Sequence, residues 1–315
     1  MDRRDLLKSA AAGVLGVWTT PHSLGAQQSP GGVRPLTDHL AVVDGGGSNV
    51  LVFSTPSSRD TRSRDARLLL VDSGVPKSDG QLIAALESLG TNSKVQTLFN
   101  THYHADQTGN NEIFGAAGAK IIAHEHTRQW MSTDYWIPDA DRYQSARPKS
   151  ARPTETFHTT GSLIAETEQI DYGYLPLAHT DGDIYVFFKT SNVLAVGDVA
   201  SPLRDPALDY FAGGWIGGRI DAMDMILKIC NEETRIVPAS GPVMTRAEFK
   251  AERDMMEEVR SRVWKRVLQG DGPKDMLEAG VLTGLPRTWK DPYKFLYDAA
   301  KGMWAQHNKL DPSLI

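Results

Sequence analysis

The chain has 315 residues, and 40% of them are hydrophobic, which is enough to bury a sizeable core in one large domain or two small ones. The formal net charge of −5 leaves no broad basic surface, so the composition argues against electrostatic binding to nucleic acid or to anionic lipid. The single cysteine, Cys230, cannot form an internal disulfide, and stability must therefore come from packing.

The N-terminal segment resembles a twin-arginine export signal. Arg3 and Arg4 precede a stretch without charge, residues 9–25, and the small residue Ala26 follows it. The alternative is an amphipathic surface helix that begins with two arginines. Because the apolar stretch is too short to span a bilayer comfortably, we expect residues 1–26 to be a signal peptide that directs the protein to the periplasm. No stable membrane insertion is expected after its removal.

Strands and helices alternate after a Gly- and Pro-containing linker at residues 27–36. Leu82, Leu86 and Leu89 recur at helical spacing, whereas the neighbouring apolar runs are short and end in turn residues. This alternation predicts a mixed sheet with helices against its face. The expected elements are strands within 40–47, 49–53, 67–74, 95–100 and 119–125, and helices at 79–90 and 110–118.

The second half of the chain changes from strands to helices. Thr245 and Glu248 have the spacing of a helix capping box. We therefore expect residues 37–244 to form one α/β domain and residues 245–315 to form a helical C-terminal extension packed on it, in a monomer or homodimer. The expected elements are strands within 163–179, 183–198 and 235–240, and helices at 249–270 and 291–304.

Aromatic residues gather in two segments that also contain glycine or proline, residues 130–143 and 209–218. Two explanations remain open: these rings line a substrate pocket or its lid, or they pack in the core. The residues concerned are Trp130, Tyr135, Trp136, Tyr210, Phe211 and Trp215.

Histidines and aspartates stand where the predicted strands end. His102 and His104 follow the apolar run "VQTLF", and two imidazoles at this spacing can converge on one ion. His179 in "LPLAHTDGD" is the best candidate for a third ligand, and three such ligands leave one tetrahedral position open for water, as in a catalytic zinc site. Asp198 in "VLAVGDVAS" and Asp72 in "LLLVDSG" occupy the same kind of position.

These motifs resemble those of the metallo-β-lactamase superfamily over nearly the whole mature chain. The family pattern is HxHxDH, a later histidine followed by a turn, an aspartate in a GD turn and a late GHG. This chain has "HYHADQ", "HTDGD", "VGDVA" and "PASGP" in the same order, with Gln107 and Ser240 in place of two histidines. The resemblance implies an α/β fold, a four-layer αβ/βα sandwich.

By similarity to the family, His102, His104 and His179 form the first metal site, and Asp198 is a further ligand that could bridge two metals. Asp72 would steady the loop or a ligand histidine. The implied activity is that of an exported Zn²⁺-dependent hydrolase, in which metal-bound hydroxide attacks the acyl carbon of a small-molecule lactam, lactone, thioester or ester.

The resemblance places Asp106, Gln107 and Ser240 at the second metal site. An amide oxygen and a hydroxyl are weak zinc ligands beside imidazole, so we expect one firmly bound Zn²⁺ and a second that is weak or absent. Asp106, a metal ligand or a catalytic group, could orient or deprotonate the attacking water. Gln107 could donate a catalytic hydrogen bond to an oxyanion or to Asp106, and Ser240 could do the same.

Two other interpretations of the whole chain stay open. The loss of two ligands is also typical of a non-catalytic binding protein derived from the fold, and two histidines with a carboxylate can serve iron in a dioxygenase. Within the chain, a second histidine pair, His124 and His126, is expected at a solvated strand end and not at a metal site. Asp183 is expected to close a turn or to cap a backbone group.

Overall fold

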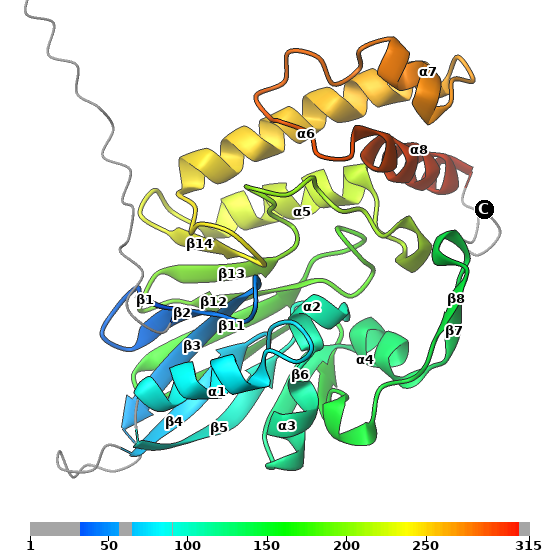
Figure 1. Ribbon diagram of the computed structural model, residues 1–315. Coiled ribbons are helices and arrows are strands. Elements are labelled where there is room, and N and C mark those ends of the chain that lie inside the picture. The colour runs from blue at the N-terminus through cyan, green and yellow to red at the C-terminus, as the bar shows by residue number, and fades with distance from the viewer. Residues whose placement is uncertain (1–31, 57–64, 90, 309–315) are drawn as a thin grey trace, which may run out of the picture.

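The computed structural model describes residues 32–56, 65–89 and 91–308 (Figure 1). The predicted signal peptide, residues 1–26, lies outside the described residues. Within the described part, two β-sheets lie face to face and helices cover their outer faces (Figure 1). None of the helices in these ranges is long and apolar enough to cross a membrane.

The first sheet has seven strands in the order β1-β2-β3-β4-β5-β6-β9. Strands β1 to β4 are antiparallel to their neighbours, whereas β4, β5, β6 and β9 are parallel. The strands are β1 (Val33–Pro35), β2 (Leu40–Asp44), β3 (Asn49–Pro56), β4 (Asp65–Val71), β5 (Thr91–Phe99), β6 (Lys120–His124) and β9 (Glu155–Phe157).

The linker predicted at residues 27–36 is wrong for its last residues. Val33–Pro35 pairs with β2 at the edge of the first sheet. The reason is local packing, because the Val33 side chain is buried in the core between this sheet and its helices.

The second sheet has five strands in the order β10-β11-β12-β13-β14, antiparallel except for the parallel pair β13 and β14. It packs on the first sheet through a core that includes aromatic contacts such as Phe53 with Phe188 and Phe99 with Tyr172. The strands are β10 (Thr160–Ala165), β11 (Glu168–Tyr174), β12 (Ile184–Phe188), β13 (Val193–Gly197) and β14 (Arg235–Pro238).

Strand β4 shows why the sequence produces layers. Leu68 and Leu70 pack toward the helices, and Leu69 and Val71 pack toward the second sheet. Successive strand residues point to opposite faces, so a strand covered on both faces must be apolar at consecutive positions. On the outer face of this sheet lie α1 (Asp79–Ser88) and α3 (Asn111–Ala116).

The outer face of the second sheet is covered by α5 (Ile216–Ile229) and α6 (Arg246–Val267). The capping box at the start of α6 is present: the Glu248 amide donates to Thr245 Oγ1 at 3.2 Å, and the Thr245 amide donates to Glu248 Oε2 at 2.8 Å. The layers thus follow the order helix, sheet, sheet, helix, which confirms the predicted four-layer αβ/βα sandwich.

The C-terminal helices pack on the same body. Helices α7 (Pro273–Glu278) and α8 (Pro292–Asn308) join α5 and α6 in one apolar cluster, to which Ile220, Met256 and Phe295 belong. In Figure 1 this group of helices lies above the second sheet.

Two short helices and a hairpin lie at one end of the sandwich, and the hairpin extends toward α8 (Figure 1). Helix α2 (Ala105–Thr108) follows β5, and α4 (Glu125–Ser132) follows β6 directly. The hairpin consists of β7 (Tyr135–Ile137) and β8 (Arg142–Gln144), and it belongs to neither large sheet (Figure 1).

Candidate metal centre

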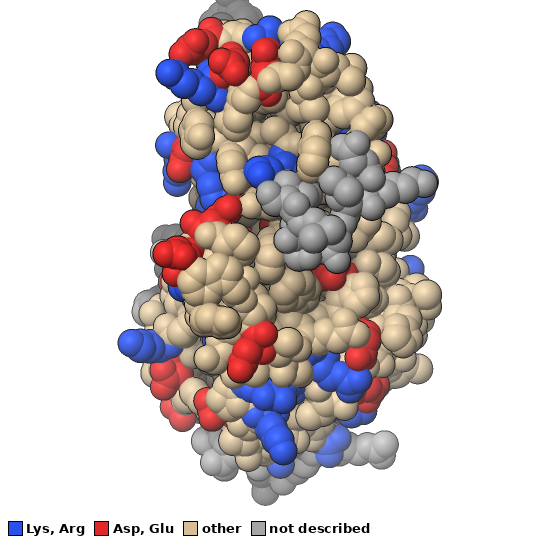
Figure 2. Space-filling model, turned by 90° about the vertical axis from the view of Figure 1, so that its right-hand side faces the viewer, with Lys and Arg blue, Asp and Glu red and all other residues tan. Residues whose placement is uncertain are grey.

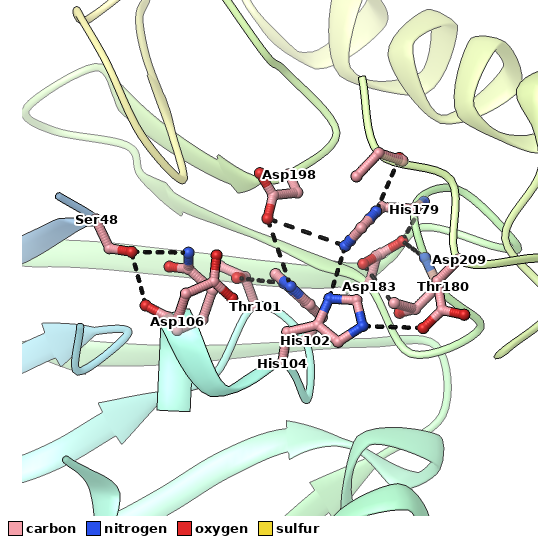
Figure 3. Close-up of polar contacts among 12 residues, drawn as sticks. Ser48, Thr101, His102, His104, Asp106, His179, Thr180, Asp183, Asp198 and Asp209 are labelled. Atoms are coloured by element: carbon pink, nitrogen blue, oxygen red, sulfur yellow. Dashed lines mark hydrogen bonds and ion pairs between the residues drawn. The ribbon is translucent and has the colours of Figure 1, made fainter. Parts of the chain in front are cut away.

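Three histidines meet at one end of the sandwich, where strands from both sheets end (Figure 3). His102 and His104 follow β5, and His179 lies in the connection from β11 to β12. His104 Nδ1 is 2.9 Å from His179 Nε2, and the three ring centroids are 4.8 to 4.9 Å apart. Each histidine can therefore direct one nitrogen toward a common point.

The donor atoms fit a metal ion. His102 Nε2 is buried and has no hydrogen-bond partner among the described residues. Burial, together with neighbouring imidazoles, holds the pKa of His102 and of His179 well below the ordinary value, so both rings are neutral. Two nitrogen ligands of a tetrahedral zinc, each about 2.0–2.1 Å from the ion, lie about 3.3 Å apart, which is near the His104–His179 spacing. The cluster is consistent with a zinc site that has one position open.

Asp209 orients His104, a role that no local sequence motif indicates. Its Oδ2 lies 2.9 Å from His104 Nε2 and also accepts a hydrogen bond from the Tyr103 hydroxyl (Figure 3). Although burial opposes ionisation, these hydrogen bonds hold the pKa of Asp209 below its ordinary range. A carboxylate on Nε2 fixes the tautomer that leaves Nδ1 free for the metal.

Asp198 lies beside the three histidines. Its Oδ2 is 3.6 Å from His102 Nε2 and 3.9 Å from His179 Nε2. Burial, with the nearby Asp106 charge, raises the pKa of Asp198 to about 6. The carboxylate is thus placed to add an oxygen ligand to the same ion.

A buried arginine holds the loop that carries Asp198. Arg219 of α5 is fully buried, and its guanidinium donates to the backbone oxygens of Asp198 at 2.6 Å and of Ala207 at 3.3 Å. The Ala207 oxygen also lies 2.9 Å from His179 Nδ1. On its other side, Arg219 contacts Glu252 of α6 at 3.3 Å. Helices α5 and α6 therefore fix the loop behind two of the candidate ligands.

Asp72 reaches the cluster through Thr101. Its carboxylate accepts hydrogen bonds from the Thr101 amide and hydroxyl, both at 2.8 Å. The Thr101 hydroxyl in turn lies 3.2 Å from His102 Nδ1 (Figure 3). Asp72 also has a positive φ of 65°, an unusual backbone conformation outside glycine. The structure therefore places it behind a ligand histidine, where it supports the loop.

A second group of possible ligands adjoins the first. Asp106 and Asp198 come close to His102, with the donor atoms within 4.8 Å of one another. Asp106 is partly exposed, and its Oδ2 lies 3.5 Å from a guanidinium nitrogen of Arg204. The Arg204 guanidinium therefore faces the Asp106 carboxylate.

Gln107 is held by a hydrogen bond to Ser48. Its side chain is fully buried and donates to Ser48 Oγ at 3.2 Å, while Ser48 donates to the Asp106 backbone oxygen at 2.7 Å. Ser48 thus links the Gln107 side chain to the Asp106 backbone. The catalytic hydrogen bond expected from Gln107 to an oxyanion or to Asp106 stays a prediction. Ser240 is also buried, in the segment after β14.

The second histidine pair is only partly solvated, because the His126 side chain is 41% exposed whereas His124 is buried. His124 is buried, and its ring stacks on Tyr174 with a centroid distance of 3.9 Å and an interplanar angle of 7°. Burial lowers the pKa of His124 to about 4. Within the described part of the chain, neither His124 nor His126 belongs to a group that could hold a metal. His124 is buried because Tyr174 of the other sheet covers its ring.

Asp183 closes a turn, as expected. Its Oδ2 accepts hydrogen bonds from the amides of His179 at 2.6 Å and Thr180 at 2.7 Å (Figure 3). The carboxylate is buried, which raises its pKa to about 7. It fixes the backbone that presents the third histidine.

Comparison with known proteins places these features in a family. The model of the metallo-beta-lactamase superfamily matches residues 61–240, more than half of the chain. No curated protein matches the sequence.

Three solved structures share the fold at low sequence identity. A metallo-beta-lactamase from Pontibacter korlensis has a TM-score of 0.54 at 17% identity, over 71% of this chain and 98% of that one. The BLEG-1 B3 metallo-beta-lactamase has a TM-score of 0.52 at 17% identity, over 66% of this chain and 93% of that one. The inverting sec-alkylsulfatase Pisa1 from Pseudomonas sp. has a TM-score of 0.61 at 12% identity, over 88% of this chain and 50% of that one. This chain therefore spans half of the alkylsulfatase.

The family match and the structure agree on the same part of the molecule. The matched residues include both sheets' central strands and the loops that carry His102, His104 and His179. On this evidence the chain belongs to the metallo-beta-lactamase superfamily.

Proposed function

We propose that this protein is a zinc-dependent hydrolase that cleaves the acyl bond of a small-molecule lactam, lactone, thioester or ester, and that it acts in the periplasm after twin-arginine export. The observation that carries the proposal is the buried His102 Nε2, which has no hydrogen-bond partner among the described residues and lies beside the nitrogens of His104 and His179. An unpaired buried nitrogen is costly unless something binds it.

The first site would hold one Zn²⁺ through His102, His104 and His179, with Asp198 as a further ligand. Zinc bound there supplies Lewis acidity, which polarises a carbonyl and makes water acidic enough to react near neutral pH. The protein then has to orient the ligands and to move a proton. Asp209 does the first for His104: its carboxylate lies 2.9 Å from Nε2 and keeps Nδ1 directed into the cluster.

Asp106 is the group that we assign to proton transfer. It is partly exposed, so water can reach its carboxylate, and it lies beside the cluster of donors. A guanidinium nitrogen of Arg204 lies 3.5 Å from this carboxylate, and a carboxylate within reach of a water can serve as a general base. Asp106 would orient the attacking water and take its proton as the oxygen bonds to the acyl carbon, and it would return that proton to the leaving group when the acyl bond breaks.

A second metal would be weakly held or absent. The Gln107 amide and the Ser240 hydroxyl are both weak zinc ligands beside imidazole. We therefore infer a stoichiometry of about one zinc per chain.

Hydrolysis of an alkyl sulfate ester is the second candidate. The observation that favours it is the superposition on the sec-alkylsulfatase, which covers 88% of this chain and so extends into the helices after residue 244. The same zinc and the same proton acceptor would serve a sulfate ester.

Metal analysis and turnover assays test the proposal together. Protein purified from its export compartment should contain about one zinc per chain and hydrolyse at least one member of a panel of lactams, lactones, thioesters, esters and alkyl sulfates. Turnover of the sulfate ester alone selects the second candidate. Bound zinc with no turnover on any member would support a non-catalytic binding protein, and iron with oxygen consumption would support a dioxygenase.

A further inference from the structure

A cavity of about 220 Å³ opens beside His104 under the β7–β8 hairpin. We propose that it binds the side group of the substrate, and that this side group is a planar aromatic ring carrying a carboxylate or a similar anion. The proposal rests on the proposed function, because it assigns a part of the same substrate.

One wall of the cavity is a rigid set of aromatic rings. Trp130 stacks on Tyr103 at 5.3 Å, and Tyr135 meets Trp130 edge-on at 4.9 Å. Phe211 lies 5.7 Å from Trp130. The Trp130 indole nitrogen donates to Asp181 at 2.8 Å, which fixes its orientation. Because these rings contact one another, a ligand would lie against the wall and not between two rings, and a flat apolar group suits such a surface.

The charge of the cavity comes from Arg142 and Arg147. The half-buried Arg147 guanidinium makes no hydrogen bond or ion pair with any residue that the structure describes, and the Arg142 guanidinium donates to the neutral Gln144 at 3.0 Å. The acidic residue in the lining, Asp209, already accepts from His104 and Tyr103. An arginine without an acidic partner is suited to a ligand carboxylate, which it can bind through two parallel hydrogen bonds.

A second cavity, of about 330 Å³, lies on the other side of Ile137 and Phe211 and is lined by His104 and His179. Its cation, Lys294, is paired with Asp298 at 2.6 Å. The two cavities therefore differ in charge, and only the first offers an arginine without a partner among the described residues. A substrate whose scissile bond lies at the histidines would place its anionic ring in the first cavity.

Figure 2 looks onto the side of the molecule on which the hairpin and α8 lie in Figure 1. On the part of this face that is drawn in colour, Lys and Arg alternate with Asp and Glu among uncharged residues (Figure 2). The described part of the face thus carries charges of both signs, and we assign recognition of an anion to the individual arginines.

Binding without turnover tests the subsite. The probes are 3-phenylpropionate, its neutral amide 3-phenylpropionamide, and propionate, titrated calorimetrically into zinc-loaded protein. The wild type should bind 3-phenylpropionate about tenfold more tightly than the amide, and Arg147→Gln should remove this preference. Tyr135→Leu should weaken the two phenyl compounds and leave propionate unchanged. The matched control is Arg128→Gln on α4, whose arginine already pairs with Glu125.

The outcomes separate the subsite from the proposed function. Equal binding of acid and amide, or a preference that survives Arg147→Gln at unchanged zinc content, would overturn the subsite, since the carboxylate would then bind elsewhere, such as at the metal. A charge preference that depends on Arg147, in a protein that hydrolyses no acyl compound, would keep the subsite and overturn the function. With turnover, Arg147→Gln should raise KM for carboxylated esters about tenfold and change kcat little.

Discussion

Two His-X-His pairs follow neighbouring parallel strands, and only one joins a metal cluster within the described part of the chain. His102 and His104 come after β5, while His124 and His126 come at the end of β6. The ring centroids are 4.9 Å apart at 89° in the first pair and 4.8 Å apart at 87° in the second. Within each pair, the geometry is nearly identical.

The opposing sheet makes the difference. Strand β11 ends in Tyr174, whose ring covers His124, and the connection after β11 carries His179 to His104. One pair thus receives a third nitrogen, and the other receives the face of an aromatic ring. The His-X-His spacing alone therefore does not make a candidate metal site. The third ligand, His179, lies 75 positions after His104 in the chain.

The largest expected effect comes from removing that residue. His179→Ala leaves two imidazoles, so bound zinc should fall from about one per chain to nearly none and turnover should drop more than about 100-fold. Metal analysis after dialysis measures the first and steady-state kinetics the second. The double variant His124→Ala and His126→Ala is the control and should keep its zinc. Zinc retained by His179→Ala would point to another third ligand.

A smaller effect should follow from changing the carboxylate behind His104. In Asp209→Asn, an amide replaces the group that fixes the tautomer, and zinc affinity should fall about 10–100-fold. Competition with a fluorescent chelator measures this. The control is Asp181→Asn, because Asp181 Oδ2 lies 3.5 Å from His126 Nδ1 in the pair without metal. Equal losses in both variants would mean that Asp209 has no special role.

Adding imidazoles should sharpen the contrast between the two metal sites. Gln107→His combined with Ser240→His puts two strong ligands at the positions that the family resemblance assigns to the second site, and zinc content should rise from about one toward about two per chain. Metal analysis at equal free zinc gives the result, with each single variant as a control. An unchanged content would show that these buried side chains do not turn toward the cluster.

The smallest effect concerns the pair under Tyr174. Burial lowers the pKa of His124 to about 4, so below the ordinary histidine pKa of about 6.5 the unfolded chain takes up a proton that the folded protein does not. Stability should therefore fall as pH drops from about 6.5 to about 4, and His124→Phe should reduce the loss between pH 7 and 5 by about 1–2 kcal/mol.

Urea unfolding in excess chelator measures this loss without interference from zinc. The control is His126→Phe. The His126 ring meets Tyr174 edge-on at an interplanar angle of 87° and does not stack on it. If His124→Phe kept the full dependence of the wild type on pH, another group would have to cause it.

The sequence predicted the layers and the histidine cluster because both depend on local patterns. Apolar runs such as that of β4 show burial on both faces, and the Thr245 capping box marks the start of α6. The three histidines each stand directly after an apolar run, which is where loops can present ligands.

The missed features depend on contacts between distant segments. Helix α5 is missing from the predicted elements because its first turn contains Gly217 and Gly218, which are poor helix formers. A Cβ at Gly218 would lie 2.0 Å from the Leu177 oxygen, so this glycine serves close packing. The role of Asp209 could not be read locally, since its partner His104 lies 105 residues earlier. Burial of His124 and Gln107 likewise depends on other segments, Tyr174 and Ser48.

The buried guanidinium of Arg219 has a consequence for how the molecule unfolds. It joins the Asp198 backbone to Glu252 of α6, and a buried charge left without its partner is strongly destabilising. Detaching α6 would therefore release the loop that carries Asp198. In zinc-loaded protein, unfolding of the C-terminal helices and loss of the metal should then be one cooperative event. The C-terminal helices therefore help to hold the loop that carries Asp198. A relative without these helices would need another contact to hold the same loop.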